Sequence, residues 1–118
     1  DRKNFDVLLL PGKFDRSFKS VDCLIFYNNS LIAFQNATKP MRVMQYTLNK
    51  SMDAFTGYKT IDQAHPAFHE PTQGTRVGDT LYYVSGSYWA GYDSNGTLKP
   101  IDELKPAVIL TVKLDTVR

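Results

Sequence analysis

The sequence has 118 residues, of which 42% are hydrophobic and 22% charged, a composition that predicts one folded domain and excludes a disordered chain. The 14 basic and 12 acidic residues give a net charge of +2, too balanced for a dedicated nucleic-acid-binding protein, so no nucleic-acid partner is expected. No apolar run approaches the roughly 18 residues of a membrane helix, and a single cysteine excludes an internal disulfide framework.

The first half of the chain predicts β-strands, because short β-branched and aromatic runs alternate with turn residues. The expected strands are 5–10, 22–27, 31–34, 41–48 and, more weakly, 55–61. The run 22–27 is continuously apolar after Asp22, which is expected of a strand covered on both faces. In 41–48, alternation places Met44, Tyr46 and Leu48 on one face.

The second half repeats this logic with expected strands 72–77, 80–84 and 107–114. Gly78-Asp79 predicts a tight turn between the first two. Scattered glycines and prolines predict a long loop over residues 85–106.

The two halves match in pattern, which predicts a repeat architecture. The segment 30–34 matches 80–84, and 44–48 matches 110–114. Such a unit at a period of about 40–50 residues is typical of β-propeller blades, which are antiparallel four-stranded sheets. We therefore expect an all-β partial ring: residues 1–17 end a preceding blade, 18–64 form one blade and 65–118 form the last. The alternative is a small antiparallel β-sandwich.

Two stretches carry a resemblance to a known family. Residues 20–26 followed by 31–36, and residues 65–74 followed by 78–89 and 107–114, resemble blades of the gluconolactonase/regucalcin-like six-bladed β-propellers. The resemblance implies that this chain corresponds to the C-terminal blades of such a ring. The remaining blades would come from the same or another chain.

The resemblance also implies a metal-dependent hydrolase that acts on a small sugar lactone or similar ester. Asp22 matches the family's aspartate at the start of an innermost strand, so it is the expected metal ligand and catalytic residue. The implied cofactor is a divalent cation, with calcium expected first and zinc or magnesium as alternatives. Cys23 stands where the family usually has glycine, and Val21 stands where it usually has proline.

Three further residues are candidate substrate contacts. Asn36 matches the asparagine that ends the next strand, although a turn-forming role is the alternative. Glu70 is a candidate supporting acid in the connection that follows His65-Pro66. Trp89, in the 85–106 loop, is a candidate sugar-stacking or lid residue, and the alternative is that it plugs the outer edge of the last blade.

Other chemistries are disfavoured. His65 and His69 have a spacing that suits a metal only on a helix, and Pro66 and Pro71 argue against a helix there. The competing function is a non-catalytic propeller that binds a ligand or partner. The compartment stays open: because the chain begins at Asp1 without Met, we expect processing or truncation, and a secreted or periplasmic location is favoured over a cytoplasmic one.

Overall fold

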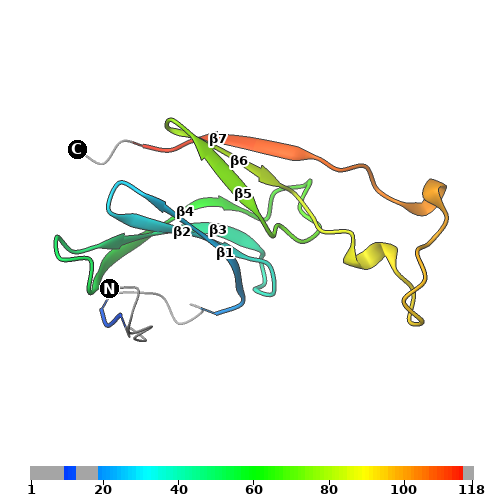
Figure 1. The fold of residues 1–118 in the computed structure, drawn as a ribbon, viewed down its shortest axis with the longest axis horizontal. Coiled ribbons are helices and arrows are strands. Elements are labelled where there is room, and N and C mark those ends of the chain that lie inside the picture. Colours follow the sequence, from blue (N-terminus) through cyan, green and yellow to red (C-terminus); the bar gives the residue numbers. More distant parts are fainter. Residues whose placement is uncertain (1–9, 13–18, 116–118) are drawn as a thin grey trace, which may run out of the picture.

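The computed structural model describes residues 10–12 and 19–115, and these form two antiparallel β-sheets (Figure 1). The first sheet has four strands in sequence order: β1 (Val21–Tyr27), β2 (Ser30–Gln35), β3 (Arg42–Leu48) and β4 (Phe55–Gln63). The second sheet has three: β5 (Gly74–Val77), β6 (Thr80–Val84) and β7 (Ile109–Lys113). The helices in the described part are two short 3₁₀ turns, η1 (Trp89–Gly91) and η2 (Ile101–Glu103). The all-β prediction is confirmed, while the expected strand 5–10 lies outside the described residues except for Leu10.

Tight turns explain why neighbouring strands pair in order. Asn28 and Asn29, between β1 and β2, have φ angles of 44° and 57°, the left-handed conformation that a two-residue hairpin turn requires. Gly78 has a φ of 60° in the turn between β5 and β6. Asparagine and glycine tolerate this conformation better than other residues, so the sequence fixes both hairpins locally.

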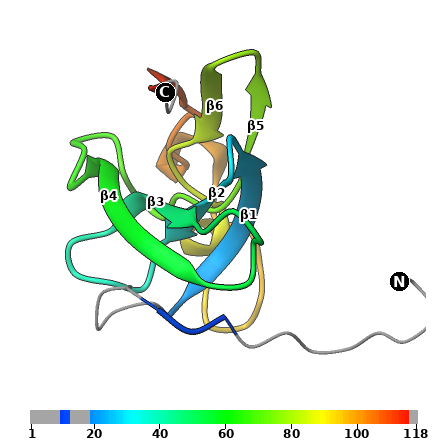
Figure 2. The same cartoon turned by 90° about the vertical axis from the view of Figure 1, so that its left-hand side faces the viewer.

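The main hydrophobic core lies between the two sheets, and Figure 2 shows β5 and β6 above β1 and β2. Ile32 and Phe34 of β2 meet Leu81 and Tyr83 of β6, and all four side chains are almost fully buried. The rings of Phe34 and Tyr83 have centroids 5.7 Å apart in a tilted arrangement. Burial of this apolar surface is the main stabilising contribution that joins the sheets.

A second core lies on the opposite face of the first sheet. Met44, Tyr46 and Leu48 are buried there, as their alternation in β3 predicts, and Leu10 packs against them. The prediction that both faces of β1 are covered is wrong for this chain, because Leu24 and Phe26 are 53% and 54% exposed. The physical reason is that no element in the described part of the chain packs over Leu24 and Phe26, whereas the other face of β1, with Cys23 and Ile25, packs against the inter-sheet core.

The two sheets differ in their number of strands. The predicted four-stranded sheet is found for β1–β4, but the second sheet has three strands among the described residues. Strand β4, expected to be weak because of Gly57, is the longest of the described strands, with nine residues. Sheets of four and three strands are compatible with two propeller blades and equally with a small β-sandwich.

The segment 85–106, here called the arm, projects away from both sheets (Figure 1). The predicted loop contains η1, η2 and an isolated bridge between Tyr92 and Leu98. Asp93 stabilises the turn inside this bridge, since its Oδ1 accepts hydrogen bonds from the backbone N–H groups of Asn95 and Thr97. The arm is therefore an ordered substructure.

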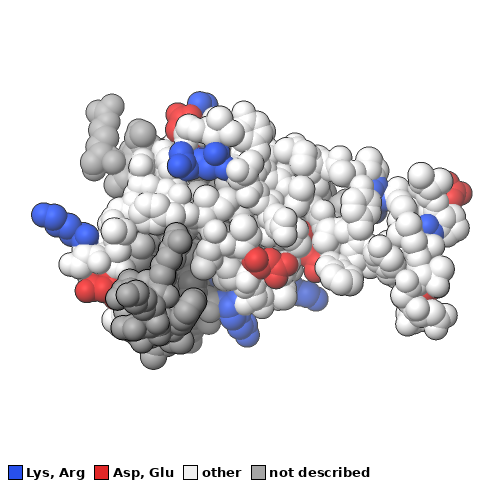
Figure 3. Space-filling model, in the orientation of Figure 1, with Lys and Arg blue, Asp and Glu red and all other residues white. Residues whose placement is uncertain are grey.

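Charged side chains of both signs are interspersed on the face drawn in Figure 3. No helix in the described part of the chain has the length and apolar character needed to cross a membrane.

Candidate functional site

Asp22 and Asn36, both predicted as site residues from the family resemblance, lie in contact. Val21 pairs with Gln35 and Cys23 pairs with Phe34, so Asp22 is the extra residue of a β-bulge in β1. Bulges change the direction of a side chain at the edge of a sheet. Here Asn36 Nδ2 donates a 2.6 Å hydrogen bond to Asp22 Oδ2. A carboxylate and an amide thus meet where β1 begins and β2 ends.

The neighbouring Gln35 fixes this end of the sheet from inside. Its side chain is fully buried, and its Nε2 donates a hydrogen bond to the backbone oxygen of Lys19. Its Oε1 accepts a 2.7 Å hydrogen bond from Arg42 Nε. The backbone that carries Asp22 and Asn36 is therefore held by a buried polar network.

Glu70 lies in a second polar contact, at the base of the arm. Ser87, which follows β6, donates a hydrogen bond to Glu70 Oε2, and Ser87 Oγ accepts one from the backbone N–H of Trp89. The backbone N–H groups of His69 and Glu70 both donate to the backbone oxygen of Ser85. The connection before β5 is thereby tied to the start of the arm.

Trp89 lies on η1 and is 74% exposed. Its ring centroid is 6.5 Å from that of Tyr92, so the two rings form an exposed aromatic pair. The structure does not place its side chain on the neighbouring cavity, which Tyr88 lines instead. The exposed indole can stack against a ligand. This position does not distinguish a sugar-stacking or lid role from a role at the outer edge of the last blade.

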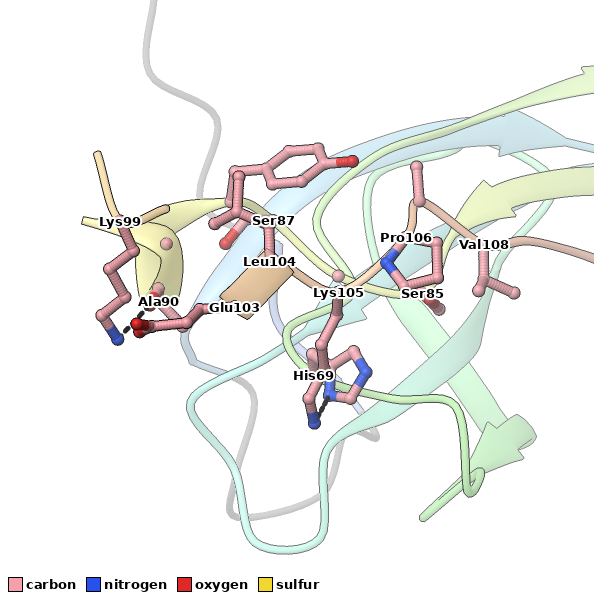
Figure 4. Close-up of a pocket in the computed structure, with 14 residues that line it drawn as sticks. His69, Ser85, Ser87, Ala90, Lys99, Glu103, Leu104, Lys105, Pro106 and Val108 are labelled. Carbon is pink, nitrogen blue, oxygen red and sulfur yellow. Dashed lines mark hydrogen bonds between the residues drawn. The ribbon is translucent and has the colours of Figure 1, made fainter. Parts of the chain in front are cut away.

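A cavity of about 340 Å³ lies between His69 and the arm (Figure 4). Its lining combines charged and polar groups with an apolar wall of Leu104, Pro106 and Val108. Gly86 permits the close approach of this chain segment, because an added Cβ would lie 2.8 Å from the Cβ of His69. Sequence reasoning missed this cavity, since its walls come from segments that only the fold brings together.

The two hydrogen-bonded pairs, Asp22–Asn36 and Glu70–Ser87, lie toward the same end of the molecule. Strands β1 and β5 contact one another, and both begin on the side from which the arm projects (Figure 1). The Asp22–Asn36 pair lies at the start of β1, and the Glu70–Ser87 pair lies shortly before β5 and at the start of the arm. Three of the four predicted site residues, Asp22, Asn36 and Glu70, therefore lie toward one end of the sheets.

The fit of these residues to a divalent cation is partial. Calcium takes about 6–8 oxygen ligands in proteins. Asp22 and Asn36 offer a carboxylate and an amide oxygen, but no group of three or more His, Cys, Asp or Glu that could hold a metal occurs in residues 10–12 and 19–115. His65 and His69 have separate partners, because His65 Nδ1 accepts from the Ala67 N–H and His69 Nδ1 lies 3.5 Å from Lys105 Nζ.

A buried tyrosine links the two sheets near this same end, where β4 ends and β5 begins. The hydroxyl of Tyr83 in β6 donates a hydrogen bond to Asp62 Oδ2 in β4. Burial, and then the hydrogen bond and charge of Asp62, raise the pKa of Tyr83 far above its ordinary value, so it stays a neutral donor. This hydrogen bond ties β6 to β4 across the interface between the two sheets.

Comparison with known proteins gave no relative: no protein-family model, no curated protein and no solved structure matches the chain.

Proposed function

We propose that this chain is part of a β-propeller hydrolase that cleaves a small sugar lactone or similar ester at the end of the sheets where β1 and β5 begin. The observation that carries the proposal is the 2.6 Å contact between Asp22 and Asn36. It brings a carboxylate and an amide together at the start of an edge strand, and these are the oxygen donors that a hard divalent cation prefers.

Within this proposal Asp22 and Asn36 supply two oxygen ligands, and the other ligands would come from the remaining blades of the ring, in the same or another chain. A bound divalent cation polarises a carbonyl and lowers the pKa of bound water. The chain's own residues have a positioning role: the bulge directs Asp22 outward, and Asn36 holds one carboxylate oxygen, which leaves Oδ1 of Asp22 for a ligand.

Asp22→Asn tests this function. The substitution keeps the shape of the side chain but removes its charge, so we expect hydrolysis of a sugar lactone by the full-length protein to fall at least about tenfold, as is typical when metal-site contacts are removed. Activity is measured as acid release, with added calcium, magnesium or zinc.

Asp53→Asn is the matched control, because Asp53 also accepts a 2.6 Å hydrogen bond from an asparagine amide, that of Asn49, but lies in the β3–β4 turn. It should retain activity. Full activity in Asp22→Asn, with unchanged thermal unfolding, would refute the role of Asp22.

A second candidate is a propeller that binds a small molecule without turnover. The same contact favours it, because one oxygen of Asp22 is already occupied by the Asn36 amide. This candidate predicts ligand binding by a native protein that shows no lactone hydrolysis with any of the three cations.

The propeller architecture rests on a different observation, the outward face of the second sheet. Val77, Tyr82 and Ile109 are 66%, 40% and 57% exposed on this side, and they flank an apolar groove. Apolar residues on both faces are typical of sheets covered on both sides. In a propeller the next blade would cover this face, whereas in a two-sheet sandwich it faces solvent.

Ile109→Val distinguishes these architectures. If another sheet covers Ile109 in the full-length protein, the substitution should lower the free energy of unfolding by about 0.5–1.5 kcal/mol, the usual cost of losing a buried methylene. Urea denaturation measures the change, and Ile101→Val is the control, because Ile101 is 87% exposed on the arm. Equal, negligible effects of both substitutions would support the sandwich.

A further inference from the structure

The cavity between His69 and the arm has walls of two kinds. Leu104, Pro106 and Val108 form an apolar wall. Lys99 and Glu103 lie together on one side in Figure 4, while Lys105 and His69 lie on another. The volume of about 340 Å³ is at the lower end of the range for small-molecule sites.

Neither of the two ammonium groups that line the cavity forms an ion pair with a residue that the structure describes. Lys99 Nζ donates a hydrogen bond to the backbone oxygen of Ala90, and the Glu103 side chain extends toward Lys99 in Figure 4. Lys105 Nζ lies 3.5 Å from Nδ1 of His69.

Glu70 is another carboxylate close to this region, and its Oε2 accepts a hydrogen bond from the Ser87 hydroxyl. The ammonium of Lys105 has three donors, so it can bind an oxyanion while remaining next to His69. Hydrogen bonds between an ammonium and a carboxylate are among the stronger ones in proteins.

We propose that this cavity binds the carboxylate of a small hydroxy acid, with Lys105 and His69 as the anion-binding groups. The inference deepens the proposed function and rests on it, because hydrolysis of a lactone produces a hydroxy acid whose carboxyl group is ionised at neutral pH. The wall of Leu104, Pro106 and Val108 contacts the C–H groups of the hydroxylated chain, and Lys105 and His69 bind its charged end.

The test compares sodium D-gluconate with its neutral amide, D-gluconamide, by titration calorimetry on the full-length protein at fixed ionic strength. We expect gluconate to bind at least about tenfold more tightly, since a hydrogen bond to a charged group contributes about that factor. Lys105→Met should reduce this preference to about twofold or less, and His69→Gln should weaken gluconate binding while leaving gluconamide binding unchanged.

Lys50→Met is the matched control, because Lys50 is exposed in the turn between β3 and β4. It should keep the full preference. The proposal is overturned if gluconate does not bind, if both compounds bind equally, or if Lys50→Met loses the preference as Lys105→Met does.

Asp22→Asn separates this proposal from the hydrolase proposal. The variant should lose hydrolysis and keep the preference for gluconate over gluconamide. A native protein that prefers gluconate but hydrolyses no lactone supports the anion site and refutes the hydrolase. A native protein that hydrolyses a lactone but shows no preference for gluconate supports the hydrolase and refutes the anion site.

Discussion

Replacing Phe34 with alanine should lower the free energy of unfolding by about 3–5 kcal/mol, the usual cost of removing a buried phenylalanine side chain. Phe34 is fully buried in β2, and its ring packs against Tyr83 of the other sheet. The loss therefore combines apolar burial with a cavity at the contact that joins the sheets. Urea denaturation followed by circular dichroism measures it.

Two companion variants locate this effect. Phe34→Leu keeps much of the volume and should cost clearly less than Phe34→Ala. Trp89→Ala removes a larger aromatic side chain that is 74% exposed, and its effect should stay within about 0.5 kcal/mol. A Phe34→Ala variant that loses less than about 1 kcal/mol would mean that the sheets do not pack through this residue.

The strands could be predicted because their signals are local. Asn28-Asn29 and Gly78-Asp79 specify two hairpins, and the alternation in β3 specifies which side chains are buried. The exposure of Leu24 and Phe26 could not be read in the same way, because it depends on whether a layer lies over the edge strand β1. An apolar run predicts a β-strand, but whether both of its faces are buried depends on tertiary packing.

The candidate site was only partly predictable for a related reason. Counting outward from the Asn28-Asn29 turn pairs Asp22 with Gln35, but the bulge pairs Val21 with Gln35 and leaves Asp22 without a cross-strand partner. A resemblance indicated Asp22 and Asn36 as residue types, while their contact follows from this irregularity. No local signal indicates the contact of His69 with Lys105, because it joins segments 36 residues apart.

Asn29→Ala should lower the free energy of unfolding by about 2–3 kcal/mol, because this residue combines two roles. It has a φ of 57°, a conformation that costs alanine about 1 kcal/mol or more. Its Nδ2 also donates hydrogen bonds of 2.8 and 2.9 Å to the backbone oxygens of Leu48 and Asn49, which attach the β1–β2 turn to the end of β3. Each bond contributes about 0.5–1.5 kcal/mol.

Asn28→Ala separates these two contributions, since Asn28 has a similar φ of 44° but is exposed. It should cost about 1 kcal/mol from the backbone alone. Asn29→Gly isolates the contribution of the side-chain hydrogen bonds, because glycine adopts the left-handed conformation readily and lacks the side chain. Equal costs for Asn28→Ala and Asn29→Ala, measured by urea denaturation, would show that the bonds to Leu48 and Asn49 contribute nothing. A larger cost at Asn29 would mean that this one asparagine both closes the β1–β2 hairpin and holds the end of β3 beside it.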